Sequence, residues 1–295
     1  MVCDGFALLP CVLVFWAVSG LTTAFVLFQV LHVHPGYHIP TISYIGNFYP
    51  ESIVHGINFS VCTILGISTV YVMYRYIHLR SQTSEIKPSW CKKASLFSGW
   101  LWCFGFEVVG IFPSNKYAAL HTGGGTIAFL FGALYIIFLS VIGYQSSPRL
   151  NSNAMCHFRM CASILTLIFL LPFSMCTIYF EVHGSSTTSY VYYASALFEW
   201  LSTMTLFVFI LTFIPDFQQI TVRRPKNWKD NWIVMKTEVE LPEVQKVLWH
   251  LGTVELRGPL LVTHQGRGSI EGPSRQTMPY DLHVAENSEP LAASI

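Results

Sequence analysis

Charged residues are scarce in this chain of 295 residues: Asp, Glu, Lys and Arg make up 11% of it, whereas a soluble domain carries about 25%. The few charges gather in short stretches with long uncharged runs between them, and hydrophobic residues reach 52%. The net charge of +1 creates no field that would attract nucleic acid. The composition therefore excludes an ordinary soluble domain and a nucleic-acid-binding protein, and it favours a membrane protein.

Common catalytic motifs are missing as well. The chain has no zinc-finger spacing, no Walker loop and none of the patterns G-x-G-x-x-G, H-E-x-x-H or G-x-S-x-G. It also lacks the repeated polar residues of a channel and the related halves of a transporter. We therefore expect a non-enzymatic protein with no cofactor, no metal and no catalytic residues.

Six apolar runs are long enough to cross a bilayer, for which a helix needs about 20 residues. Backbone groups in lipid must be satisfied internally, so each run is expected to be helical. The expected spans cover residues 6–33, 53–74, 94–112, 120–144, 160–180 and 190–214. The predicted fold class is all-α, a polytopic membrane protein with a six-span domain over residues 1–223 and a tail over residues 224–295.

Basic residues predict how the chain crosses the membrane. Of the 17 Lys and Arg residues, only Lys116 lies outside the connections after the second and fourth spans and the segment that follows the sixth span. The positive-inside rule places the basic side, and with it both termini, in the cytosol. The tail is rich in Pro, Gly, Ser and charge, and we expect it to be mostly disordered. An interfacial helix over residues 232–251 is an alternative that Pro242 disfavours.

None of the eight cysteines lies in a predicted outer loop, so the sequence predicts no disulfide framework. Cys91 and Cys156 fall at cytosolic membrane edges, where thiols can be palmitoylated. An unmodified thiol is the alternative that we favour.

Three ionisable residues are candidate polar anchors within the spans, where such groups usually face a partner or a cavity. Glu199 falls near the middle of the sixth span. Glu107 and His121 are expected at similar depth on neighbouring helices, where they could hydrogen-bond. This pair could form a proton-sensitive contact or a polar ligand site, but a helix-packing bond is the simpler reading. Small residues at four-residue spacing, Gly124, Ala128 and Gly132, predict close helix packing.

Histidine collects at the outer membrane edge and in the outer loops. One interpretation is pH sensing, because an unperturbed histidine gains charge as the pH falls through about 6.5. Metal binding by His32, His34 and His38 is disfavoured because no carboxylate or cysteine completes a ligand set. Ordinary interfacial polar residues remain the third reading. The candidates for pH sensing are His32, His34, His38, His55 and His183.

Five short motifs occur in one order along the chain. They are Pro40-Thr41-Ile42-Ser43-x-x-Gly46 followed by Pro50-Glu51, His121 with Gly123-Gly124, Cys156-His157-Phe158-Arg159-Met160, Glu199-Trp200, and Asp216-Phe217-Gln218. On these residues the chain resembles the six-span family that contains the damage-regulated autophagy modulators, the tentonin group and the yeast Sfk proteins. It departs from the modulators at Tyr44-Ile45, where they usually carry Asp-Thr, and at residues 111–113, where they carry Asn-Phe-Gln.

The resemblance implies a lysosomal or endosomal membrane protein that promotes autophagy and, in a related subgroup, regulates apoptosis. No reaction is established for the family, so it supplies no catalytic residues. We expect a scaffold whose cytosolic loops and tail recruit protein partners still to be identified. The first outer loop is a candidate recognition surface or, alternatively, a rigid loop of ordinary turn residues. Its candidate residues are Pro40, Ser43, Gly46, Pro50 and Glu51.

Three other functions are compatible with the resemblance. Sfk-like relatives suggest a plasma-membrane adaptor that organises a phosphoinositide kinase. The tentonin group suggests a mechanosensitive channel component. A more distant relative acts in the maturation of GPI-anchored proteins and suggests an enzyme of lipid remodelling.

Overall fold

The computed structural model describes residues 5–32, 39–82, 89–145, 153–183, 189–222 and 233–235. All of them belong to one compact unit, Met1–Lys246. In chain order the elements are η1 (Gly5–Ala7), α1 (Leu8–Leu31), α2 (Ile42–Ile45), α3 (Glu51–Gln82), α4 (Ser89–Ile111), α5 (Ala118–Gln145), α6 (Asn153–His183), α7 (Ser189–Leu211), α8 (Ile214–Phe217), β1 (Ile220–Val222) and β2 (Ile233–Met235).

The six expected spans are confirmed as α1, α3, α4, α5, α6 and α7, each long and apolar enough to cross a membrane. α3, α5 and α6 extend beyond both ends of the apolar windows that predicted them, whereas α1 lies within its window. α3, for example, has 32 residues and ends at Gln82 rather than near residue 74. Helical hydrogen bonds do not stop where hydrocarbon stops, so hydropathy marks the span better than the helix end. The predicted orientation of the termini stays a prediction.

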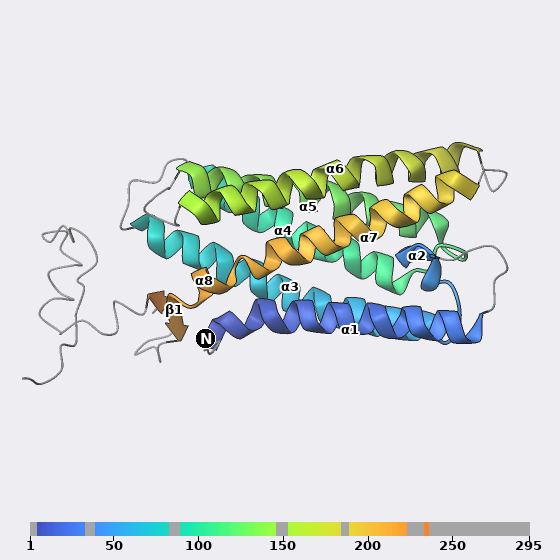
Figure 1. Ribbon diagram of the computed structural model, residues 1–295. Helices are drawn as coiled ribbons and strands as arrows, with labels where there is room; N and C mark the ends of the chain where they lie inside the picture. The colour runs from blue at the N-terminus through green and yellow to red at the C-terminus, as the bar shows by residue number, and fades with distance from the viewer. Residues whose placement is uncertain are drawn as a thin grey trace, which may run out of the picture. The chain divides into compact units, whose positions relative to one another are not determined.

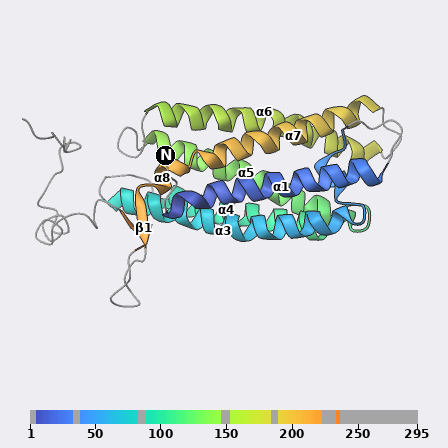
Figure 2. The ribbon, with the colours of Figure 1, turned by 60° about the horizontal axis from the view of Figure 1, so that its bottom comes forward.

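Consecutive long helices lie side by side as antiparallel pairs (Figures 1 and 2). α4 and α5 approach most closely because small residues face one another. A Cβ added to Gly105 would lie 2.4 Å from the backbone nitrogen of Ala128, and one added to Gly132 would lie 2.9 Å from the Trp102 ring. The close packing predicted from Gly124, Ala128 and Gly132 is therefore confirmed.

The two ends of the bundle differ. At one end, which we call the β1 end, η1 and the amino terminus of α1 meet α8 and η1 meets β1, while β2 contacts α3 (Figure 1). β1 and β2 pair antiparallel, with Ile220 opposite Met235. The strand at Ile233–Met235 was not predicted, and it occupies the start of the stretch for which an interfacial helix was the alternative. The remainder of the predicted tail lies outside the described residues.

The other end, which we call the α2 end, holds the short helix α2 between α1, α3 and α7 (Figure 1). Large apolar side chains point outward along the bundle, including Phe15, Ile64 and Leu171. An apolar exterior is what a bilayer requires, because lipid rather than water is the solvent there.

Candidate functional site: a loop held at the α2 end

The loop between α1 and α3, described here over residues 39–50 and called the α2 loop, is held by a carboxylate from α7. Glu199 Oε2 accepts a hydrogen bond from the backbone N–H of Ile42 at 2.7 Å. Its Oε1 accepts from the N–H of Ser43 at 3.3 Å and from the Ser43 hydroxyl at 3.0 Å. The first N–H groups of a helix have no partner within it and favour negative charge. Glu199 therefore caps α2 from another helix.

Trp200, the next residue of α7, holds the same loop one step earlier. Its indole Nε1 donates to the carbonyl of Pro40 at 3.0 Å, while its ring packs edge-on against Phe25 of α1 at 6.0 Å. Thr41 completes the turn by accepting from the N–H of Tyr44 at 3.0 Å. Two neighbouring α7 residues thus fix three backbone groups of the α2 loop. This joins two of the motifs noted in the sequence, which lie far apart along the chain.

The second attachment links the end of α1 with the start of α3. His32 Nε2 lies 3.2 Å from Glu51 Oε1 and 3.3 Å from Oε2, and the Glu51 side chain is 0% exposed. The His32 ring also packs against Phe48 at 4.7 Å. Glu51 opens α3, where negative charge is favoured.

His55, one turn further along α3, packs against the α2 loop at Gly46. A Cβ added to Gly46 would lie 2.9 Å from His55 Cδ2, so only a glycine fits there without displacing the ring. His55 is 3% exposed and packs on Phe59 at 4.4 Å. Neither ring nitrogen has a hydrogen-bond partner among the described residues. Such a histidine is best accommodated in its neutral form.

The predicted hydrogen bond between Glu107 and His121 is wrong. Glu107 Oε1 accepts from the Ser60 hydroxyl of α3 at 2.7 Å, and its Oε2 is buried without a partner in the described part of the chain. His121 Nδ1 instead lies 2.7 Å from the carbonyl oxygen of Phe112. Similar depth did not imply contact, because the two side chains face different directions around their helices.

The other candidate loop residues also turn inward. Pro40 and Gly46 are buried and Glu51 is fully enclosed, while Ser43 is committed to Glu199. Their burial disagrees with an exposed recognition surface made by these side chains, and it favours the alternative of a rigid loop. Pro50, the residue before α3, is half-buried.

Two of the remaining histidine candidates, His34 and His38, lie outside the described residues. His183 is the last residue of α6, and its side chain is not among those that the structure describes. The candidate palmitoylation sites are both packed inside the bundle: Cys91 and Cys156 are each 3% exposed. Cys156 Sγ lies 3.5 Å from the Gly143 carbonyl oxygen. Their burial favours the unmodified thiols.

A buried ion pair at the β1 end was missed by the sequence reasoning. Arg159 was counted as a loop residue, but it lies within α6 and its guanidinium binds Asp216 of α8, which is 0% exposed. Arg159 Nε also donates to the Thr212 hydroxyl at 2.9 Å, and the guanidinium lies over the Phe213 ring at 5.6 Å. Burial of paired charge is tolerated where hydrogen bonds satisfy both partners. The available signal was that Arg159 and Asp216 each belong to one of the five motifs.

The polar groups of Glu199, Ser43 and Trp200 therefore hold the backbone of the α2 loop in place. Among the described residues, no group of three or more His, Cys, Asp or Glu side chains could bind a metal ion. The Glu199 carboxylate accepts three hydrogen bonds from Ile42 and Ser43, and the residue is 5% exposed.

Comparison with known proteins finds one matching family and several similar proteins. The family model described as "Frag1/DRAM/Sfk1/Cwh43P N-terminal domain" matches residues 5–220. DNA damage-regulated autophagy modulator protein 1 of Xenopus laevis is 33% identical over 229 residues, which cover 75% of this chain and 94% of that protein. Modulator protein 2 of Rattus norvegicus is 27% identical over 237 residues, covering 76% and 88%. Modulator of macroautophagy TMEM150B of Bos taurus is 26% identical, covering 72% and 86%. No solved structure matches the chain.

Proposed function

This chain belongs to the Frag1/DRAM/Sfk1 family of membrane proteins, and from that membership we propose that it is a multi-pass modulator that promotes autophagy from the lysosomal or endosomal membrane. The similar proteins are named as autophagy modulators in two subgroups. The protein also regulates apoptosis, a role that the resemblance to a related subgroup implies. The protein acts as a non-enzymatic scaffold, whose cytosolic loops and tail bind protein partners.

The observation that carries the scaffold role is the use of Glu199. A carboxylate in a membrane span raises the free energy of insertion, so such groups usually have a structural or functional role. Here all three of its hydrogen bonds go to Ile42 and Ser43 of the α2 loop. A catalytic carboxylate needs a free position next to a substrate proton, whereas this one fixes a loop. A structural task for this carboxylate is what the scaffold proposal expects.

Charge distribution supports the proposed orientation. Lys116 lies at the α2 end. The other 16 basic residues lie at the β1 ends of α3, α4 and α6, in the α3–α4 and α5–α6 connections, or after α8. The proposal places the β1 end in the cytosol and the α2 end on the luminal side. Partners would then bind at the β1 end, while the α2 loop keeps the luminal ends of α1, α3 and α7 together.

Location is the decisive test of this function. The full chain with a carboxyl-terminal tag, expressed at low level, should overlap a lysosomal marker rather than a plasma-membrane marker. Deletion of the gene should lower autophagic flux, and re-expression of the chain should restore it. Residence at the cell surface with unchanged flux would overturn the proposal and favour the phosphoinositide-kinase adaptor. A stretch-dependent current from the purified chain in a planar bilayer would favour the channel component.

A further inference from the structure

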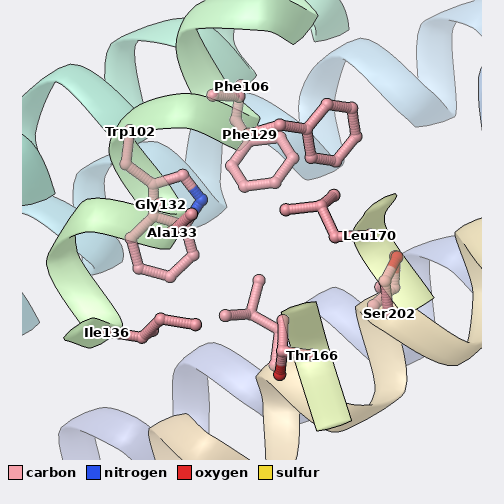
Figure 3. A pocket seen from close by; sticks show the side chains of 12 residues that line it. Trp102, Phe106, Phe129, Gly132, Ala133, Ile136, Thr166, Leu170 and Ser202 are labelled. Carbon is pink, nitrogen blue, oxygen red and sulfur yellow. The ribbon is translucent and has the colours of Figure 1, made fainter. Parts of the chain in front are cut away.

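A cavity inside the bundle is too small for a ligand of lipid or metabolite size. It lies between the α4–α5 pair and the α6–α7 pair and has a volume of about 30 Å³ (Figure 3). One buried water needs about 10–15 Å³ of such space. The cavity therefore holds one or two water molecules. Its lining includes Trp102, Phe129, Gly132, Thr166 and Ser202.

Basic side chains gather elsewhere, where α3 ends and α4 begins at the β1 end of the bundle (Figure 1). His78 of α3 interacts electrostatically with Arg75, one turn earlier on the same helix, and with Lys92 of α4. The Lys92 ammonium donates a hydrogen bond to the Ser81 hydroxyl of α3 at 2.8 Å, which fixes the two helices to each other. All three basic side chains are half-buried. We call Arg75, His78 and Lys92 the basic corner.

Negative charge is scarce around the basic corner. The charged groups that act on His78 are both cations. The described residues contribute one carboxylate to the β1 end, Asp216, which binds Arg159 and interacts electrostatically with Arg80. The first turn of α4 holds no acidic residue, and a helix amino terminus carries partial positive charge itself. An anion bound at the corner would reduce the repulsion between its cations.

The basic corner lies at the level of the lipid headgroups. At 1.5 Å per residue, Arg75 lies about 36 Å along the helix from Glu51, the first residue of α3. The hydrocarbon core of a bilayer is only about 30 Å thick. Trp90, the second residue of α4, is 62% exposed, and exposed tryptophan is typical of the membrane–water interface. An anion at this level belongs to a lipid headgroup more readily than to a soluble molecule.

The chemistry of the three side chains favours a phosphate ligand. The Arg75 guanidinium can bind two phosphate oxygens at once, and the Lys92 ammonium keeps two protons beyond the one that it donates to Ser81. A ring N–H of His78 supplies a further donor. A phosphate monoester carries a charge of about −1.5 to −2 at pH 7, which matches the two permanent cations Arg75 and Lys92. The phosphodiester of an ordinary phospholipid carries a single negative charge.

We propose that the basic corner binds the phosphate monoester headgroup of a lipid, with Arg75 and Lys92 donating hydrogen bonds to its oxygens. The assignment to the cytosolic leaflet rests on the proposed orientation of the chain, but the binding itself does not. Because the site joins α3 to α4, the lipid would stabilise their junction at the membrane surface. Binding is measured on the purified protein, so its failure would leave the proposed function in autophagy untouched.

The test uses the full chain purified in detergent, with native mass spectrometry to count bound lipids during titration. Phosphatidic acid, a monoester, should bind more tightly than phosphatidylglycerol, a diester with the same acyl chains. Lys92→Gln should weaken the binding of phosphatidic acid about fivefold, which corresponds to about 1 kcal/mol for one basic residue at a lipid surface. Lys93→Gln is the matched control, because it removes the same charge from an exposed position on the same helical turn. It should leave the affinity nearly unchanged.

A second variant separates the loss of a cation from a disturbed fold. Lys92→Arg keeps the charge and the donors, and it should retain the affinity of the wild type for phosphatidic acid. The proposal is overturned if Lys92→Gln and Lys93→Gln weaken binding equally, since diffuse positive charge would then suffice. Equal binding of the two lipids would also overturn it. Complete displacement of phosphatidic acid by an equal concentration of inorganic phosphate would contradict a lipid as the ligand.

Discussion

The carboxylate of Glu199 binds the backbone of Ile42, which lies 157 residues earlier in the chain. α2 has only four residues, and a helix this short is not stable by itself. Its position therefore depends on the contacts that Glu199 and Trp200 make. The motif in the α2 loop and the Glu199-Trp200 motif are two halves of one structural unit.

Glu199→Gln should loosen the α2 loop. The amide nitrogen of Gln cannot accept from the N–H groups of Ile42 and Ser43, so at least one buried donor loses its partner. Hydrogen bonds to a charged group contribute about 1.5–3 kcal/mol each, and we expect a loss of about 2–4 kcal/mol in stability. Hydrogen exchange of residues 41–46 in nanodiscs, together with the melting temperature, measures it.

Glu107→Gln is the matched control. Glu107 is also an intramembrane carboxylate, but among the described residues it accepts one hydrogen bond, from the Ser60 hydroxyl, for which the Gln carbonyl is an adequate acceptor. Its effect should stay below about 1 kcal/mol, with no change in exchange at residues 41–46. Equal effects of the two substitutions would show that α2 does not depend on Glu199.

The sequence was informative where the signal is local. Hydropathy predicted the six spans, and four-residue spacing predicted the contact face of Gly124, Ala128 and Gly132 because both patterns repeat within one helix. Contacts between distant segments were less accessible. Similar depth suggested Glu107 and His121 as partners, but depth does not fix the direction of a side chain around its helix. Arg159 was predicted to lie in a connection because it precedes the apolar run of the fifth span, and its partner Asp216 lies 57 residues away.

Arg159→Met should be strongly destabilising. It removes the guanidinium that binds the fully buried Asp216, and breaking one side of a buried ion pair costs about 3–5 kcal/mol. The double variant Arg159→Met with Asp216→Leu should be less destabilised than Arg159→Met alone, since no charge is then left unpaired. Thermal unfolding in detergent compares the two. A double variant whose loss equals the sum of the single losses would contradict the coupling.

Gly46→Ala tests the packing of the α2 loop against His55 of α3. The backbone of Gly46 (φ −66°) tolerates alanine, so the expected effect is steric only. The added methyl group would press on His55, and overpacking of this kind costs about 1–3 kcal/mol. Gly123→Ala is the control, because nothing lies within 4 Å of its added Cβ. That change should be neutral or stabilise α5 by up to about 1 kcal/mol, as measured by thermal unfolding.

Low pH should weaken the packing of the α2 loop on α3, because His55 would become protonated. No acceptor among the described residues contacts either ring nitrogen, so the protonated ring would be a buried charge without a partner. The stability that the neutral form contributes is therefore lost as the pH falls. Protection factors of residues 41–46 should drop between pH 7.5 and pH 5 in the wild type. In His55→Phe, which cannot gain charge, a smaller drop is expected. Identical drops would assign the effect to another group, such as Glu199.

Rescue of autophagic flux by Glu199→Gln in cells that lack the protein most directly tests whether it works as a scaffold. Flux and the amount of folded protein at the lysosome are measured together, with wild type and Glu107→Gln as references. A scaffold predicts that flux falls only in proportion to the amount of folded Glu199→Gln protein. Complete loss of flux at a normal level of folded, correctly located protein would contradict the scaffold and indicate a chemical role for the carboxylate.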